Sequence, residues 1–119
     1  MTKKNYMILN ILKTLLVTAT IYNAEPSQTD STPFITASNA VINECCPGDH
    51  RWLAVSRDLE AYGFVFGAKV EITGAGRFDG IWTVQDRMNK RYVRSIDLLV
   101  DNHIKLGKWY NVEIKLIND

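Results

Sequence analysis

The sequence has few residues of the kinds that mark the more easily recognised protein classes. Only two of its 119 residues are cysteine and three are proline, so neither a disulfide-rich scaffold nor a proline-rich chain is indicated. A membrane-spanning helix needs about 20 apolar residues, and Lys13 interrupts the most apolar stretch. Residues 25–119 hold 11 basic and 13 acidic residues, so they lack the basic surplus of a nucleic-acid-binding domain. Nucleic acid is therefore not expected as a partner.

The residues that are present suit one small folded domain. Apolar residues make up 46% of the chain, 12 residues are aromatic, and the charged fraction of 23% is ordinary for a globular protein. The N-terminus resembles an export signal, because Lys3 and Lys4 precede a mostly apolar stretch that ends near Ala24. We therefore predict a signal peptide at 1–24, a polar linker at 25–33 and a domain at 34–119. The prediction places the protein in the periplasm or outside the cell, with no stable membrane span after processing. The alternative is a buried or interfacial helix that the mature protein keeps.

The two cysteines, Cys45 and Cys46, are neighbours in the sequence. Adjacent Cα atoms lie about 3.8 Å apart, which is closer than the usual disulfide range. A bridge between them would be strained, so two reduced or partly buried thiols at a turn formed by Pro47 and Gly48 are favoured, and the sequence leaves their redox state open. A metal site with His50 as a further ligand is the alternative, but a zinc site normally has three or four protein ligands at recognisable spacings. No metal or other cofactor is predicted.

The pattern along the domain is one of short strands with glycines at the corners. Apolar and polar residues alternate at 68–73 and 110–117, while 81–85 and 95–100 are rich in β-branched or apolar residues. A further strand is expected at 34–40. Two short helices are expected, one from Ser56 to Gly63 and one at 101–107. These features predict a small all-β barrel.

Two aspartates are candidates for chemistry. Asp97 lies between Ile96 and Leu98 in an apolar strand, and Asp86 lies at the end of the preceding strand, eleven residues earlier. Burial or a nearby carboxylate raises the pKa of an aspartate, which would make Asp97 a usable general acid near neutral pH. The alternative is a structural role, in which Asp97 accepts backbone N–H groups or pairs with an arginine of the same segment (Arg87, Arg91 or Arg94).

The Asp86-Arg87 pair, followed by a loop and the sequence RSIDL at 94–98, resembles the signature of double-psi β-barrels of the rare lipoprotein A type. It is also similar to the three-aspartate domain of membrane-bound lytic transglycosylase A. Residues 54–59, 66–72 and 106–114 resemble other strand-forming parts of those families, so the resemblance covers about 34–117.

The resemblance implies a six-stranded double-psi barrel that acts on peptidoglycan or another cell-wall polysaccharide. In the enzymes, one aspartate protonates the glycosidic oxygen and then accepts the proton of the 6-hydroxyl group, which leaves a 1,6-anhydro sugar. Asp97 would take that role, with Asp86 as its partner. The alternative is a non-catalytic, expansin-like module that binds glycan or loosens the wall, because the fold alone does not decide the activity.

The loop at 88–93 departs from the resembled enzymes, because it is bulky and basic where they usually carry glycine. Such a loop would reshape the groove or bind phosphates and carboxylates of the wall. The third aspartate is left open between Asp79 and Asp101. The residues predicted to bind substrate are basic or aromatic and lie in or near loops: Arg87, Tyr92, Arg94, Trp52 and Trp109. The sequence predicts no oligomeric state.

Overall fold

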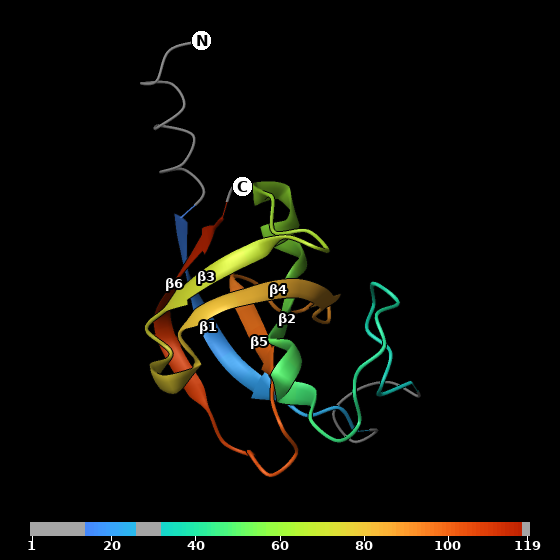
Figure 1. The fold of residues 1–119 in the computed structure, drawn as a ribbon. Coiled ribbons are helices and arrows are strands. Elements are labelled where there is room, and N and C mark those ends of the chain that lie inside the picture. The colour runs from blue at the N-terminus through green and yellow to red at the C-terminus, as the bar shows by residue number, and fades with distance from the viewer. Residues whose placement is uncertain (1–13, 26–31, 118–119) are drawn as a thin grey trace.

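The computed structural model describes residues 14–25 and 32–117, and these form a closed barrel of six strands (Figure 1). The order around the barrel is β1-β5-β2-β4-β3-β6. The predicted class, a small six-stranded all-β barrel, is therefore confirmed. The strands are β1 (Thr14–Tyr22), β2 (Trp52–Val55), β3 (Lys69–Thr73), β4 (Gly80–Arg87), β5 (Ser95–Leu99) and β6 (Lys108–Leu116).

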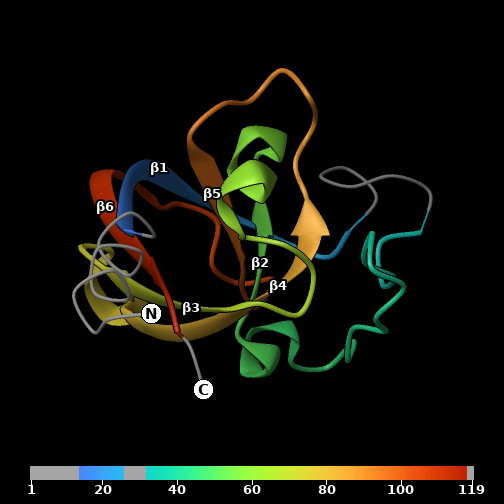
Figure 2. The ribbon, with the colours of Figure 1, turned by 90° about the horizontal axis from the view of Figure 1, so that it is seen from above.

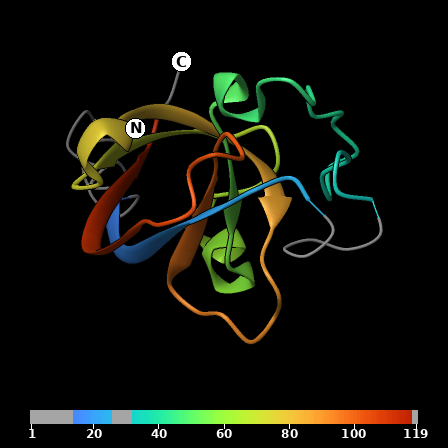
Figure 3. The ribbon, with the colours of Figure 1, turned by 90° about the horizontal axis from the view of Figure 1, so that it is seen from below.

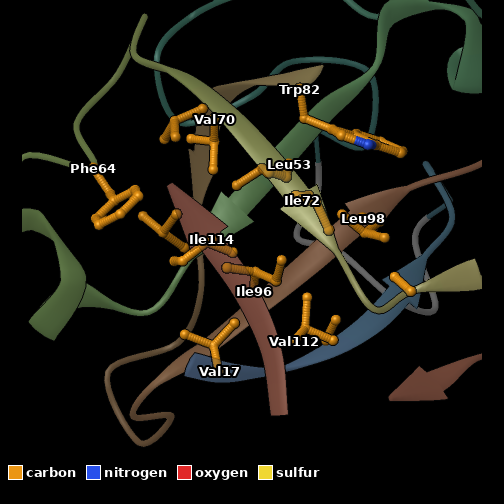
Figure 4. Packing of buried hydrophobic residues seen from close by; sticks show 14 of the residues in the cluster. Val17, Leu53, Phe64, Val70, Ile72, Trp82, Ile96, Leu98, Val112 and Ile114 are labelled. Carbon is orange, nitrogen blue, oxygen red and sulfur yellow. The ribbon is translucent and has the colours of Figure 1, made fainter. Parts of the chain in front are cut away.

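The core lies inside the barrel, where inward side chains from all six strands meet (Figure 4). The alternation in β3 buries Val70 and Ile72 and exposes the residues between them. Trp82 of β4 is 1% exposed, as expected for a packed tryptophan, and its indole N–H donates to the carbonyl of Phe78 at 2.8 Å. Burying an apolar side chain of this size contributes about 1.5–3 kcal/mol, so this core accounts for much of the stability.

Strand β1 corrects the predicted domain boundaries. It pairs with β5 on one side and β6 on the other (Figure 3). It buries Val17 and Ala19 in the core. The barrel therefore does not begin at residue 34, and removal of residues 1–24 would take one strand out of a closed sheet. The apolar run forms a strand because residues 14–22 are largely β-branched and alternate between the two faces. Residues 1–13, the rest of the predicted signal peptide, lie outside the described residues.

Four of the five predicted strands are present, with ends shifted by a few residues, as β3, β4, β5 and β6. The strand expected at 34–40 is wrong, because only a single bridge joins Ile35 to Val41. The helix expected between Ser56 and Gly63 is present as the 3-10 helix η2 (Arg57–Tyr62). The helix expected at 101–107 is a turn and irregular chain. Two further 3-10 helices are η1 (Pro47–His50) and η3 (Gly76–Phe78). No helix among the described residues is long and apolar enough to cross a membrane.

The strand pairing repeats within the barrel. Exchanging β1 with β4, β2 with β5 and β3 with β6 leaves every neighbour and every direction unchanged. The parallel pair β1–β5 corresponds to the parallel pair β4–β2, and the β2–β5 pair maps onto itself. The two ends of the barrel chain lie side by side, because Thr14 pairs with Lys115. The barrel is thus two three-strand halves related by an approximate two-fold axis.

Residues 32–43, here named the strap, lie outside the barrel, to the side of the end of β4 (Figure 2). Ser38 fastens the strap to β4, because its hydroxyl donates to the Gln85 side chain at 2.7 Å. A disulfide joins Cys45 and Cys46 just after the strap, where the sequence favoured two thiols and left their redox state open. With both sulfur atoms bonded to each other, the alternative of a metal site with His50 loses its two thiolate ligands.

Candidate functional site

The two predicted catalytic aspartates lie in one row on the outer face of the barrel. Ala54 of β2 pairs with Asp86 of β4 on one side and with Asp97 of β5 on the other, and Thr20 of β1 pairs with Asp97. Cross-strand partners project to the same face, and neighbouring strands are about 4.8 Å apart, so the two aspartate Cα atoms are about 10 Å apart. Ala54, the residue between them, is 5% exposed and belongs to an apolar cluster on this outer face with Tyr22 and Leu99.

A β-bulge at Gln85 puts Asp86 on this outer face. Leu53 pairs with Val84 but the next residue, Ala54, pairs with Asp86, so Gln85 is an extra residue in β4. Simple alternation would point Asp86 to the same side as the buried Val84, into the core. Bulges commonly redirect side chains in this way near functional sites. The bulge thus explains how a strand with an inward Trp82 and Val84 ends with an outward carboxylate.

Asp97 is half-buried, and its carboxyl group holds its proton more tightly than an exposed aspartate does. Burial raises the pKa of Asp97 to about 6; the hydrogen bond from Thr20 opposes this rise, and the negative charge of Asp86 adds to it. The hydroxyl of Thr20 donates to Asp97 Oδ1 at 2.8 Å. The neighbours Ile96 and Leu98 point into the core, so the strand fixes Asp97 outward. A group with this pKa can both donate and accept a proton near neutral pH.

Asp86 is held by three donors. Its Oδ2 accepts from the Tyr22 hydroxyl at 3.2 Å, and its Oδ1 accepts from the backbone N–H groups of Ala37 at 3.0 Å and Arg87 at 2.9 Å. These three hydrogen bonds fix the orientation of the carboxyl group. One of them comes from the strap, so Asp86 links the strap to the barrel. The structural alternative, pairing of Asp97 with an arginine, is not seen in the described part of the chain.

Tyr22 connects the two acids. It is 7% exposed, and burial, followed by the charges of Asp86 and then Asp97, raises its pKa well above the usual value for tyrosine. The phenol therefore stays protonated and donates to Asp86 over the whole neutral range. Neither Tyr22 nor Thr20 was predicted as a site residue, because their segment was assigned to a signal peptide. The alternation of residues 18–22, with threonine at every second position and a tyrosine at the end, was the available signal.

Both acids open into one cavity of about 590 Å³ between the strap, the end of β4 and the loop at 88–94. The strap residues in its lining include Thr32 and Pro33, which were predicted to belong to a linker. The remaining lining is mostly polar, with three arginines and two tyrosines among its side chains: Tyr22, Arg57, Asp86, Arg87, Asn89, Arg91, Tyr92 and Asp97. Donors and aromatic faces of this kind suit a hydroxyl-rich ligand.

The five predicted substrate-binding residues divide into two groups. Arg87 and Tyr92 line the cavity. Arg94 does not; its guanidinium group reaches the carbonyl of Leu16 at 3.5 Å. Trp52 stacks on His50 with ring centroids 3.9 Å apart. Trp109 packs edge-on against Phe78 at 5.7 Å, and neither tryptophan borders the cavity.

Neither candidate for a third aspartate lies at this site. Asp79 accepts the backbone N–H groups of Gly74 and Ala75 and so closes the turn between β3 and β4. Asp101 accepts the N–H of Gly48 at 2.8 Å and connects η1 to the chain after β5. Both aspartates therefore fix loops, and the cavity holds a pair of carboxyl groups.

Comparison with known proteins adds no family to this description. No family model, curated protein or solved structure matches the chain. The functional argument therefore rests on the geometry of the cavity and its two acids.

Proposed function

We propose that the protein acts on cell-wall glycan, with peptidoglycan as the polymer, and cleaves it in the manner of a lytic transglycosylase. The observation that carries the proposal is the placement of Asp97, whose pKa is raised to about 6, beside Asp86 in an open cavity. The two-fold strand pairing supports assignment of the barrel to the double-psi class. Peptidoglycan lies outside the cytoplasmic membrane, so the proposal includes export, with residues 14–24 kept in the folded domain.

In the proposed reaction Asp97 acts first as acid and then as base. Its carboxyl proton passes to the glycosidic oxygen as the bond from that oxygen to C1 breaks. The sugar's own 6-hydroxyl oxygen then bonds to C1 and gives its proton to the Asp97 carboxylate. Asp97 ends protonated as it began, no water is consumed, and the product carries a 1,6-anhydro ring.

Asp86 and Tyr22 support this step without taking part in bond formation. The charge of Asp86 favours retention of the proton on Asp97 and stabilises positive charge that develops at C1. Tyr22 fixes the orientation of Asp86 through its 3.2 Å hydrogen bond. The glycosidic bond would lie in the cavity that both acids line.

The test is to incubate purified protein with peptidoglycan and analyse the soluble products by mass spectrometry. We expect anhydro-sugar fragments from the native chain and none from Asp97→Asn, whereas Asp49→Asn, at an exposed carboxylate away from this cavity, keeps the activity. Because Asp97 must be protonated at the start, kcat/KM should fall about tenfold per pH unit above pH 6. Wall binding without any product would reject cleavage and favour the expansin-like binding module.

A further inference from the structure

The mouth of the cavity carries more positive charge than its carboxylates neutralise. Three arginines line it, namely Arg57, Arg87 and Arg91. Arg87 is occupied by Glu60, to which it donates two hydrogen bonds, at 3.1 and 2.8 Å. Within the described residues, Arg57 and Arg91 form no ion pair. Two exposed guanidinium groups are therefore left with their charge unpaired beside the site.

Both groups are held in place by neutral contacts. Arg57 Nε donates to the carbonyl of Met88 at 3.4 Å. Arg91 lies over the ring of Tyr92, with 4.9 Å between Cζ and the ring centroid, and its Nη2 donates to the Tyr92 hydroxyl at 2.9 Å. Asn89 fixes the turn beneath them by accepting the N–H of Arg91 at 3.0 Å. Each guanidinium has five N–H donors, so most of them remain available to a ligand.

We propose that Arg57 and Arg91 bind an acidic substituent of the glycan, a carboxylate or a phosphate group. This inference rests on the proposed glycan ligand but does not require that the glycan be cleaved. The charges also favour one orientation of the bound polymer. Asp86 and Asp97 repel its acidic substituent from the centre of the cavity, while the arginines attract it at the mouth. A neutral glycan would leave both guanidinium groups without a partner, and charge-assisted hydrogen bonds of this type are about twice as strong as neutral ones.

The test measures binding of the full chain to insoluble wall material in four forms. The first is untreated, the second is stripped of phosphate polymers by acid, the third has its carboxyl groups converted to amides, and the fourth has both treatments. We expect the doubly treated wall to bind about tenfold or more weakly than the untreated wall. The single treatments identify which acidic group is bound. Equal affinity for all four forms, or no binding to any of them, would overturn the inference.

A pair of variants links this preference to the two arginines. The double variant Arg57→Gln/Arg91→Gln should lose the difference between untreated and doubly treated wall. Arg77→Gln, at an exposed arginine of η3 outside the cavity, should keep it. A double variant that retains the preference would show that other groups bind the anion. If charge-dependent binding is present but no anhydro product is formed, the proposed cleavage fails while this inference stands.

Discussion

At the scale of single residues, the environment of Asp97 sets the proton affinity of the site. The carboxyl group is half-buried, and its pKa of about 6 compares with about 3.9 for aspartate in an unfolded chain. Between these two values the folded state binds more protons than the unfolded state, so the free energy of unfolding falls as the pH rises. Ionised Asp97 therefore lowers the stability of the barrel at neutral pH, which is typical of a group retained for chemistry.

Replacing Asp97 with asparagine should raise the free energy of unfolding at pH 7.5 by about 1–3 kcal/mol. The asparagine oxygen can still accept from Thr20, so the change removes charge and keeps the hydrogen bond. The measurement is urea unfolding from pH 4 to pH 8 for both chains. We expect the gain of Asp97→Asn over the native chain to develop between pH 4 and pH 6. Parallel profiles for the two chains would contradict the assigned proton affinity, and Asp49→Asn serves as the matched control.

Asp97 could be predicted from sequence because an acid between two core residues of a strand needs an explanation. Asp86 followed from its spacing and strand-end position. The contacts that Tyr22 and the strap make with Asp86 could not be predicted, since they join residues 64 and 49 positions apart. Arg94, Trp52 and Trp109 were chosen for their residue type and their position in or near loops, and neither criterion shows which side of a barrel a loop reaches.

At the scale of elements, strand β1 determines whether the barrel closes. Apolar content alone does not separate a buried strand from an export signal, and the lysines near the N-terminus favoured the second interpretation. Threonines that alternate with apolar residues are the better guide, because a strand with one solvent-exposed face and one buried face has this two-residue period. The bulge at Gln85 was also beyond prediction, since nothing in the local sequence marks the extra residue.

Substitutions on the two faces of β1 should therefore differ sharply. Ala19→Asp places an unpaired charge where the native residue is 0% exposed, and we expect a loss of at least about 3 kcal/mol or failure to fold. Leu16→Asp changes a residue of the same strand that is 51% exposed, and its cost should be within about 1 kcal/mol. Circular dichroism during urea unfolding measures both. Equal, small effects would show that β1 is dispensable and would restore the predicted boundary at residue 34.

At the scale of the whole molecule, the approximate two-fold axis passes through the row of residues at the site. The axis relates Asp97 to Ala54 and Asp86 to Thr20, because the β2–β5 pair maps onto itself. The fold thus offers equivalent positions on both halves, and the sequence makes them different. One half supplies both acids. The other half supplies the methyl group of Ala54, which lies between them, and the hydroxyl group of Thr20, which donates to Asp97.

The neighbouring positions of Thr14 and Lys115 have a consequence for how the chain can be connected. Joining residue 117 to residue 14 by a short glycine-serine linker and opening the chain between the exposed Gly76 and Arg77 gives a circular permutant that starts in the second half. We expect it to unfold cooperatively and to keep the pH response that Asp97 confers. Opening the chain inside β2, between Leu53 and Ala54, should abolish folding. Folding would then depend on the order of the strands around the barrel, and not on which strand comes first in the chain.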